Sequence, residues 1–169
     1  MQHTLTVLVE NKPGVLARVS AMFSNRGFNI HSLAVGPTHQ EGRSRITLVV
    51  DAPELEQLKK QLNKLVNVIK VQEMEQTEAL EREVMIVRIA AQPATRGEVR
   101  DTASLFDARV IDLSTSAITF EVSGSPQHLQ TFLDHMSPYG VVDLVKSGRI
   151  AMRRESELTP ATIGAGVGK

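Results

Sequence analysis

The segment 10–19 carries the residue types best suited to hold a small charged ligand. An alternating strand pattern ends at Glu10, Pro13 and Gly14 make a tight turn, and an apolar helical stripe begins directly afterwards. Free backbone N–H groups at a helix start, aided by the helix dipole, favour a carboxylate. Gly14 lets a ligand approach the backbone because it has no Cβ. The Asn11 amide can donate to a carboxylate or accept from an ammonium. We therefore expect a site for a small carboxylate here.

A second polar residue, Asn29, follows in the cluster Arg-Gly-Phe-Asn-Ile at 26–30. In a strand whose Phe28 and Ile30 face the core, the Asn29 amide points the other way or along an interface. On an edge strand near the first turn, it would serve the same ligand as Asn11. Two plainer interpretations stay open. In one, Asn11 caps the helix while Gly14 only eases the turn; in the other, Asn29 simply faces solvent.

Patterns for catalysis or metal binding are weak in this chain. Residues 164–169 superficially resemble a phosphate-binding loop, but Ile163 stands where that motif needs glycine, and no Ser or Thr follows. His128 and His135 flank an apolar helical stripe, where surface histidines are more common than metal ligands. No Gly-x-Ser-x-Gly or His-Glu-x-x-His pattern is present. We therefore expect no catalytic residue and no metal site.

The apolar periodicity of the first half predicts the elements that position this turn. Leu5, Val7 and Val9 alternate with polar residues, as in a strand. An apolar stripe over 15–23 predicts a helix that ends near Gly27. The remaining elements are predicted as strands at 28–37, 45–51 and 66–71 and a helix at 55–65. The order β-α-β-β-α-β is the ferredoxin-like arrangement, with both helices on one face of an antiparallel sheet.

The second half repeats this order of elements. A Glu- and Gln-rich stretch predicts a linker at 76–83 between a first domain, 1–75, and a second, 84–154. The predicted elements of the second domain are strands at 83–91, 110–113 and 118–122, helices at 98–106 and 129–136, and a closing strand at 141–152 interrupted near Gly148. Residues 155–169 lack periodicity and predict a flexible tail. The expected fold class is α+β, with two ferredoxin-like domains in tandem.

The first half also predicts a homodimer. A domain of about 75 residues is marginal alone, so either the two halves pack together or the first half pairs with another copy. The strand at 28–35 would form an open sheet edge, and it contains no Lys, Asp or Glu to discourage pairing. We therefore expect two copies to meet along this edge.

The composition limits the class of function. Lys and Arg together number 19, as do Asp and Glu, so the chain lacks the basic excess of a typical nucleic-acid binder. Cysteine is absent, which excludes disulfides, thiolate nucleophiles and Cys-based zinc sites. We recognise no secretory signal and no apolar run near the ~18 residues that a membrane span needs. We expect a cytoplasmic protein with no nucleic-acid or membrane partner.

Two adjoining motifs resemble a known family. Asn-x-Pro-Gly-Val-Leu-x-Arg-Val at 11–19 and Phe-x-x-Arg-Gly-x-Asn-Ile at 23–30 are similar to the ACT amino-acid-sensing domain of the regulatory (small) subunit of acetolactate synthase, or acetohydroxyacid synthase. The similarity continues in Asn-Ile-x-Ser-Leu-x-Val at 29–35, Ser-Arg at 44–45, and Gln-Leu-x-Lys-Leu-Val-x-Val at 61–68. Glu-Arg-Glu-x-Met at 81–85 resembles the domain junction, and Ile-Asp at 111–112 falls within the C-terminal domain. The resemblance covers about residues 2–154.

The resemblance implies a non-catalytic chain that binds a larger catalytic subunit. That subunit condenses two pyruvates, or pyruvate with 2-oxobutyrate, using thiamine diphosphate, Mg²⁺ and usually FAD; no cofactor is expected in this chain. Binding would raise the partner's activity and confer feedback inhibition, usually by valine, held between two ACT domains paired side by side. Carried onto matching positions, the polar groups of valine would be held by Asn11, Gly14 and Asn29, and its side chain would be lined by Val15, Leu16 and Ile30.

Three alternative functions have less support in the sequence. An RNA-binding module of similar fold needs aromatic residues on its central strands, and the strands at 5–9 and 46–50 contain none. A stand-alone enzyme lacks a recognisable site. An ACT-type amino-acid sensor that regulates a different enzyme or transcription would keep the same site and change only the output.

Overall fold

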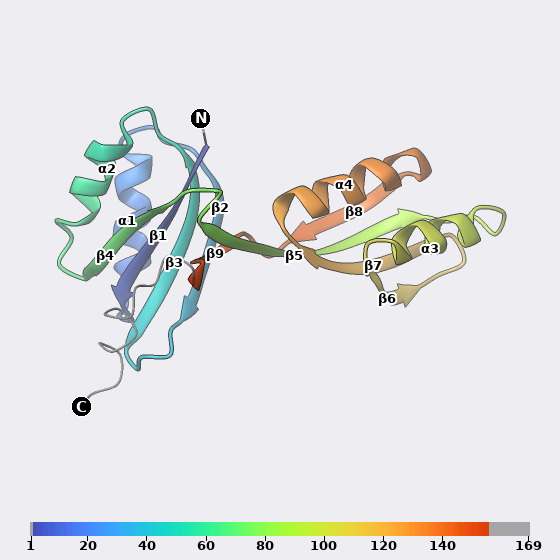
Figure 1. Cartoon of the computed structure of the whole chain (residues 1–169), viewed down its shortest axis with the longest axis horizontal. Helices are drawn as coiled ribbons and strands as arrows, with labels where there is room; N and C mark the ends of the chain where they lie inside the picture. Colours follow the sequence, from blue (N-terminus) through green and yellow to red (C-terminus); the bar gives the residue numbers. More distant parts are fainter. Residues whose placement is uncertain (1, 156–169) are drawn as a thin grey trace. The chain divides into compact units, whose positions relative to one another are not determined.

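The computed structural model describes residues 2–155, so the tail expected at 155–169 lies outside the described residues except for Glu155. The chain divides into two compact units. The first extends to Leu80 and resumes at Arg149, and the second runs from Glu81 to Gly148. Within the described residues, each unit contains an antiparallel sheet and two α-helices (Figure 1), which confirms the predicted fold class.

The first unit places its strands in the spatial order β2-β3-β1-β4. The elements along the chain are β1 (Gln2–Glu10), α1 (Val15–Ser24), β2 (Ile30–Pro37), β3 (Arg43–Asp51), α2 (Leu55–Leu62) and β4 (Val68–Met74). β3 pairs antiparallel with both β1 and β2, so β1 and β2 run parallel on either side of it. The strand β2 is therefore an edge of this sheet, as the sequence predicted.

Both helices cover one face of the first sheet (Figure 1). They form at the predicted places because their apolar residues recur at helical spacing, as with Val15, Val19 and Phe23 on α1. These side chains pack against alternate residues of the central strands, including Leu5 and Leu48, which are fully buried. Burial of one such side chain stabilises the fold by roughly 1.5–3 kcal/mol. This packing fixes the strand ends from which the candidate site is built.

The second unit repeats the topology, with strands in the order β6-β7-β5-β8. Its elements are β5 (Ala79–Ala90), α3 (Arg96–Ser104), β6 (Arg109–Leu113), β7 (Ala117–Gly124), α4 (Pro126–Met136) and β8 (Val141–Lys146). The core lies between one face of the sheet and the helices, where Val87, Phe120 and Phe132 are almost completely buried. The Ser125 hydroxyl caps α4 by accepting a hydrogen bond from the His128 N–H.

Several predicted boundaries shift by a few residues, and those at β2 and β5 matter most for the site and for the division into units. The strand expected at 28–37 begins at Ile30, so Phe28 and Asn29 precede it. The linker expected at 76–83 is strand from Ala79 onward, because Ala79 begins a buried–exposed alternation that continues through β5. The interruption expected near Gly148 is confirmed, because the closing strand at 141–152 is two strands, β8 and β9 (Ile150–Arg153). Residues from Arg149 onward belong to the first unit.

Candidate functional site

The turn between β1 and α1 leaves backbone donors available. Gly14 is the N-cap of α1, with φ 82° in the left-handed region that glycine adopts readily, and no side chain caps the helix. Among the described residues, the N–H groups of Leu16 and Ala17 have no acceptor. A Cβ at Gly14 would meet no atom within 4 Å. A small anion can therefore approach these donors without displacing a side chain.

The Asn11 side chain does not cap the helix, so the plainer interpretation of this residue is wrong. The Asn11 backbone N–H donates to the Gly42 carbonyl at 2.8 Å, which fixes the turn against the loop before β3. The side chain is exposed and makes no hydrogen bond to another described residue. Its amide belongs to the same turn as Gly14, and no described residue occupies its hydrogen-bonding groups.

A short polar network supports the turn from the side of β4. The carboxylate of Glu10 accepts a hydrogen bond from the Asn67 amide at 2.7 Å and pairs with Lys12 at 3.0 Å. The bond from Asn67, followed by that from Lys12, holds the pKa of Glu10 below its usual value. Arg18 donates to the Asn67 side-chain oxygen at 2.7 Å. The carboxylate of Glu10 is therefore paired within the chain, which reduces its repulsion of a ligand carboxylate.

Sequence reasoning missed most of this network. Asn67 lies 57 residues from Glu10, so no local pattern connects the two residues. Arg18 gave a usable signal, because it lies one helical turn after Gly14 and its N–H bonds to the Gly14 carbonyl at 3.1 Å.

Within one chain, Asn29 lies far from the turn, and the expectation that it sits near the first turn is wrong. The Asn29 carbonyl accepts from the Asp51 N–H at the end of β3, whereas Asn11 bonds to Gly42 just before the start of β3. At roughly 3.4 Å per residue, the intervening strand separates the two asparagines by about 30 Å. One chain therefore supplies two separated halves of the predicted site, one at each end of the sheet.

The three predicted apolar contacts divide between the same two ends. Val15 and Leu16 follow the turn, but Val15 is buried in the core and only Leu16 is exposed. Ile30 lies at the opposite end beside Asn29, partly buried against the core. Leu16 and Ile30 are thus the residues that can contact the side chain of a ligand, and Val15 anchors the first turn of α1 against the sheet.

The edge strand β2 exposes apolar residues beside its unpaired backbone. Leu33 and Val35 pair across the sheet with Leu48 and Ile46 of β3, so they point to the helix-covered face. Whereas Leu48 and Ile46 are buried, Leu33 and Val35 are 37% and 47% exposed. An edge with free N–H and C=O groups, apolar side chains and no acidic or lysine residue is suited to pairing with another strand.

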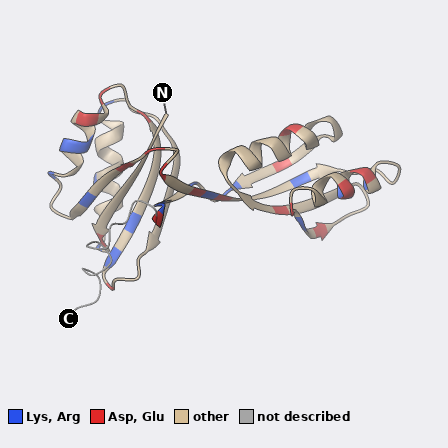
Figure 2. Ribbon diagram, in the orientation of Figure 1, with Lys and Arg blue, Asp and Glu red and all other residues tan. Residues whose placement is uncertain are grey.

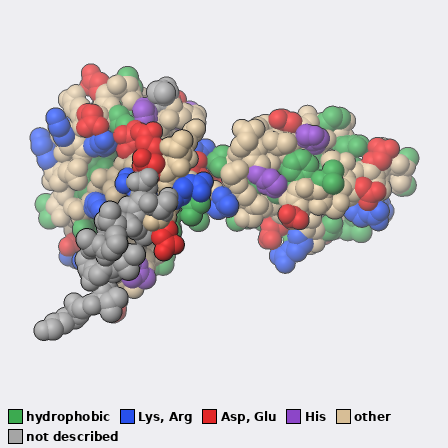
Figure 3. Space-filling model, in the orientation of Figure 1, with side chains coloured by type: hydrophobic (Ala, Val, Ile, Leu, Met, Phe, Trp, Pro, Cys, Tyr) green, Lys and Arg blue, Asp and Glu red, His purple; other side chains and the backbone are tan. Residues whose placement is uncertain are grey.

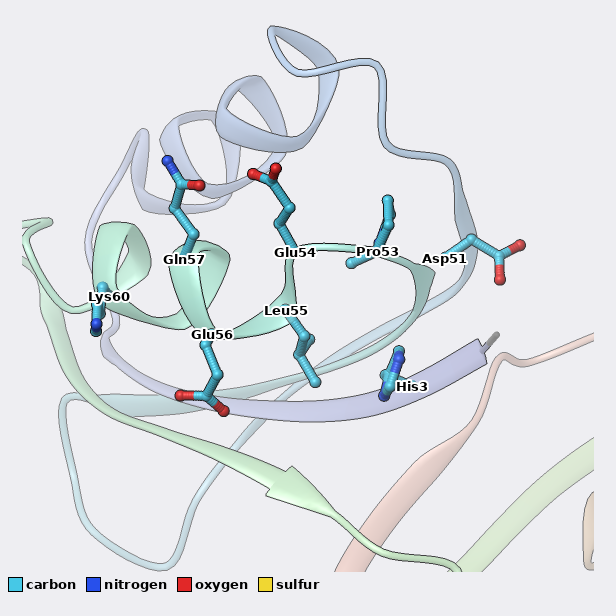
Figure 4. A pocket seen from close by; sticks show the side chains of 9 residues that line it. His3, Asp51, Pro53, Glu54, Leu55, Glu56, Gln57 and Lys60 are labelled. Carbon is cyan, nitrogen blue, oxygen red and sulfur yellow. The ribbon is translucent and has the colours of Figure 1, made fainter.

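An open cavity of about 1010 Å³ lies at the start of α2 and is lined by His3, Asp51, Ala52, Pro53, Glu54, Leu55, Glu56, Gln57 and Lys60. Its carboxylates point in different directions, with Glu54 and Glu56 on opposite sides of the helix and Asp51 directed away (Figure 4). The lining contains none of the residues predicted to hold the effector.

The described residues form no metal centre. No group of three or more His, Asp or Glu side chains is arranged to bind a metal within residues 2–155. His128 and His135 direct ring nitrogens at the carbonyl oxygens of Phe106 and Thr131, at 3.1 and 2.8 Å. These hydrogen bonds account for the positions of the two histidine rings without a bound metal ion.

Charges of both signs are interleaved along each unit (Figure 2), and the visible face has no large patch of one sign among its described residues (Figure 3). Such a surface does not resemble the basic face that neutralises phosphates in nucleic-acid binders. None of the described helices is long and apolar enough to span a membrane.

Comparisons with known proteins converge on one family. Residues 5–70 match the family model of the "AHAS small subunit-like ACT domain", and residues 82–155 match that of the "Small subunit of acetolactate synthase". The acetolactate synthase small subunit of Mycolicibacterium smegmatis is 49% identical over 96% of this chain and 95% of its own length. A probable acetolactate synthase small subunit of Archaeoglobus fulgidus is 46% identical over 91% and 98%. The crystal structure of the acetolactate synthase small subunit of Thermotoga maritima superposes with a TM-score of 0.82 at 30% identity, covering 91% of this chain and 98% of that one.

Proposed function

Since this chain belongs to the acetolactate synthase small-subunit family, we propose that it binds the catalytic large subunit, raises its activity and confers feedback inhibition by a branched-chain amino acid, valine first. In this proposal the chain is not itself catalytic and acts in the cytoplasm. The condensation chemistry, with thiamine diphosphate, Mg²⁺ and FAD, belongs to the large subunit.

The observation that carries the effector proposal is the separation of Asn11 and Asn29. Two copies that pair antiparallel along β2 would place the Ile30 end of one strand against the Pro37 end of the other. Pro37 pairs with Ser44, which also pairs with Val9, so the Pro37 end is the end of the sheet that carries the turn. Asn29 of one copy would then lie beside Asn11 and Gly14 of the other. Twofold symmetry makes two such sites in each dimer.

Each copy of the chain would contribute groups that the other copy cannot place at the same site. The first turn of α1 offers N–H donors to the carboxylate of valine, and the Asn11 amide can bind either charged group. Asn29 and Ile30 from the second copy would close the site around the ammonium and the side chain. Leu16, exposed next to the turn, would complete the apolar wall. A site shared in this way exists only in the dimer, which links effector binding to how the subunits pair.

The energies involved fit a feedback effector. Burial of an aliphatic side chain contributes ~1.5–3 kcal/mol, so the polar groups must supply most of the orientation. Discrimination between valine and its larger relatives rests on about 1–3 kcal/mol per methylene, so leucine and isoleucine should bind more weakly rather than not at all. A coupling of about 1–3 kcal/mol to the catalytic subunit corresponds to a 5- to 150-fold effect.

A reconstitution experiment tests this function. The purified chain is mixed with the large subunit of acetolactate synthase, and acetolactate formation is followed while valine is titrated. The expected result is a rise in activity on mixing, followed by a fall with valine. An increase that valine leaves unchanged would contradict the effector assignment. No increase at all, together with capture of a different enzyme or a transcription regulator from the native cell, would favour a sensor with another output.

A further inference from the structure

The first sheet has a second face, which the helices do not cover. Thr4 and Val49 alternate with the core residues of β1 and β3 and therefore point to this second face, where both side chains are buried. The pairing register places four residues in one row across all four strands. From one edge of the sheet to the other, they are Ser32 on β2, Val49 on β3, Thr4 on β1 and Met74 on β4.

The segment 149–153, here called the return segment, lies along this row. The Arg149 backbone N–H donates to the Ser32 hydroxyl at 2.7 Å. The guanidinium of the same residue donates to the Thr4 hydroxyl at 3.4 Å. Ala151 is buried in a small cluster that contains Met74. The return segment therefore contacts the edge strand β2, the central strand β1 and the opposite edge strand β4.

The β4 side of the return segment is held by backbone pairing. β9 pairs with β5, and the Arg154 N–H donates to the Glu78 carbonyl at 2.8 Å. On the β2 side, the Arg149 N–H donates a short hydrogen bond to Ser32. A displacement of β2 relative to the rest of the sheet would thus strain or break this bond while β9 stays in place.

Ser32 is also close to the proposed effector site, because it lies on β2 three residues after Asn29. The register between β2 and β3 shifts between Ile30 and Ser32, so the bond from Arg149 holds the strand directly after an irregularity. The return segment is joined to β8 of the second unit through Gly148, whose φ of 89° few other residues adopt.

We propose that the hydrogen bond between Ser32 and Arg149 couples effector occupancy at β2 to the return segment, and through the chain at Gly148 to the second unit. This inference rests on the proposed function. Occupation of the site at Asn29 favours one position of β2, and the Ser32 contact favours one arrangement of the return segment. A ligand then shifts the population between the two arrangements by its preference for one of them. Ser32 and Arg149 are positioning residues and do not touch the effector.

The test separates effector binding from its consequence. Ser32→Ala removes the acceptor, and the full-length variant is combined with the large subunit. We expect stimulation of the large subunit to equal that of the wild type, and calorimetry to show that valine still binds, because the residues proposed to hold it are unchanged. The ratio of activity without valine to activity at saturating valine should fall toward one, by about fivefold. Arg149→Ala, which keeps the backbone bond to Ser32 but loses the contact with Thr4, should show a smaller loss.

Matched controls exclude a general effect on the sheet. Thr4→Val removes the other acceptor, and Thr6→Val makes the same change two residues further along the same face. Thr4→Val should weaken inhibition by valine, and Thr6→Val should leave it unchanged. Wild-type inhibition in Ser32→Ala would overturn the proposal, as would losses of affinity and inhibition by the same factor. A wild-type chain that binds no branched-chain amino acid would instead remove the proposed function, and the coupling with it.

Discussion

Asn11 and Asn29 lie at opposite ends of one sheet, the first hydrogen-bonded to Gly42 before β3 and the second to Asp51 at its end. Both residues belong to the motifs that resemble an amino-acid site, yet one chain cannot bring them to one ligand. In the proposed function a second copy of the chain completes the effector site, so a mixture of two different variants can test it.

Mixing two defective variants should restore valine binding. Asn11→Ala and Asn29→Ala each spoil both sites of a symmetric dimer. In an equal mixture that exchanges subunits freely, about half the dimers are hybrids, and each hybrid has one site with both asparagines intact. Calorimetry should then recover about a quarter of the wild-type binding capacity. A site formed within one chain would give no recovery, because every chain in the mixture carries a substitution.

A charge at Gly14 should abolish inhibition while leaving stimulation of the large subunit intact. Gly14→Asp brings a carboxylate next to the expected position of the effector carboxylate, and their repulsion should raise the valine concentration for half-inhibition at least about tenfold. Gly14→Asn is the matched control, because Asn and Asp tolerate the left-handed conformation similarly and differ in charge. Equal losses in both variants would assign the effect to size or backbone strain instead.

A lysine on the edge strand should dissociate the dimer. Val35 is exposed on β2, where a charged side chain would have to be buried between two copies. Val35→Lys should weaken dimerisation about tenfold or more, measured by sedimentation across a dilution series, and weaken valine binding in parallel. Val66→Lys is the control, since Val66 is 92% exposed and outside the strand. A dimer unaffected by Val35→Lys would place the interface on another surface.

The order of elements could be predicted from the sequence because apolar periodicity identifies faces, and the ferredoxin-like order then fixes the sheet. The positions of Asn11 and Asn29 could not, because a local pattern does not show which end of a neighbouring strand a residue reaches. The start of β5 at Ala79 could not be predicted for a related reason. Charged residues that suggest a linker interrupt the alternation that begins there. The contact of Arg149 with Ser32 joins residues 117 apart and has no local signal.

The contact between His31 on β2 and Asp51 at the end of β3 makes the free energy of unfolding depend on pH. The His31 Nε2 lies 2.6 Å from an oxygen of Asp51, and this hydrogen bond holds the pKa of Asp51 below its usual value of 3.8. A carboxyl whose pKa is lower in the folded state contributes stability above its unfolded pKa and loses it as pH falls through the folded pKa. Urea unfolding should therefore show wild type more stable than Asp51→Asn at pH 7, with the difference shrinking below about pH 4.

His31→Ala should return the pKa of Asp51 toward its usual value in an NMR titration, because His31 is the largest cause of the shift. A carboxyl that titrates identically with and without His31 would show that the contact does not persist in solution.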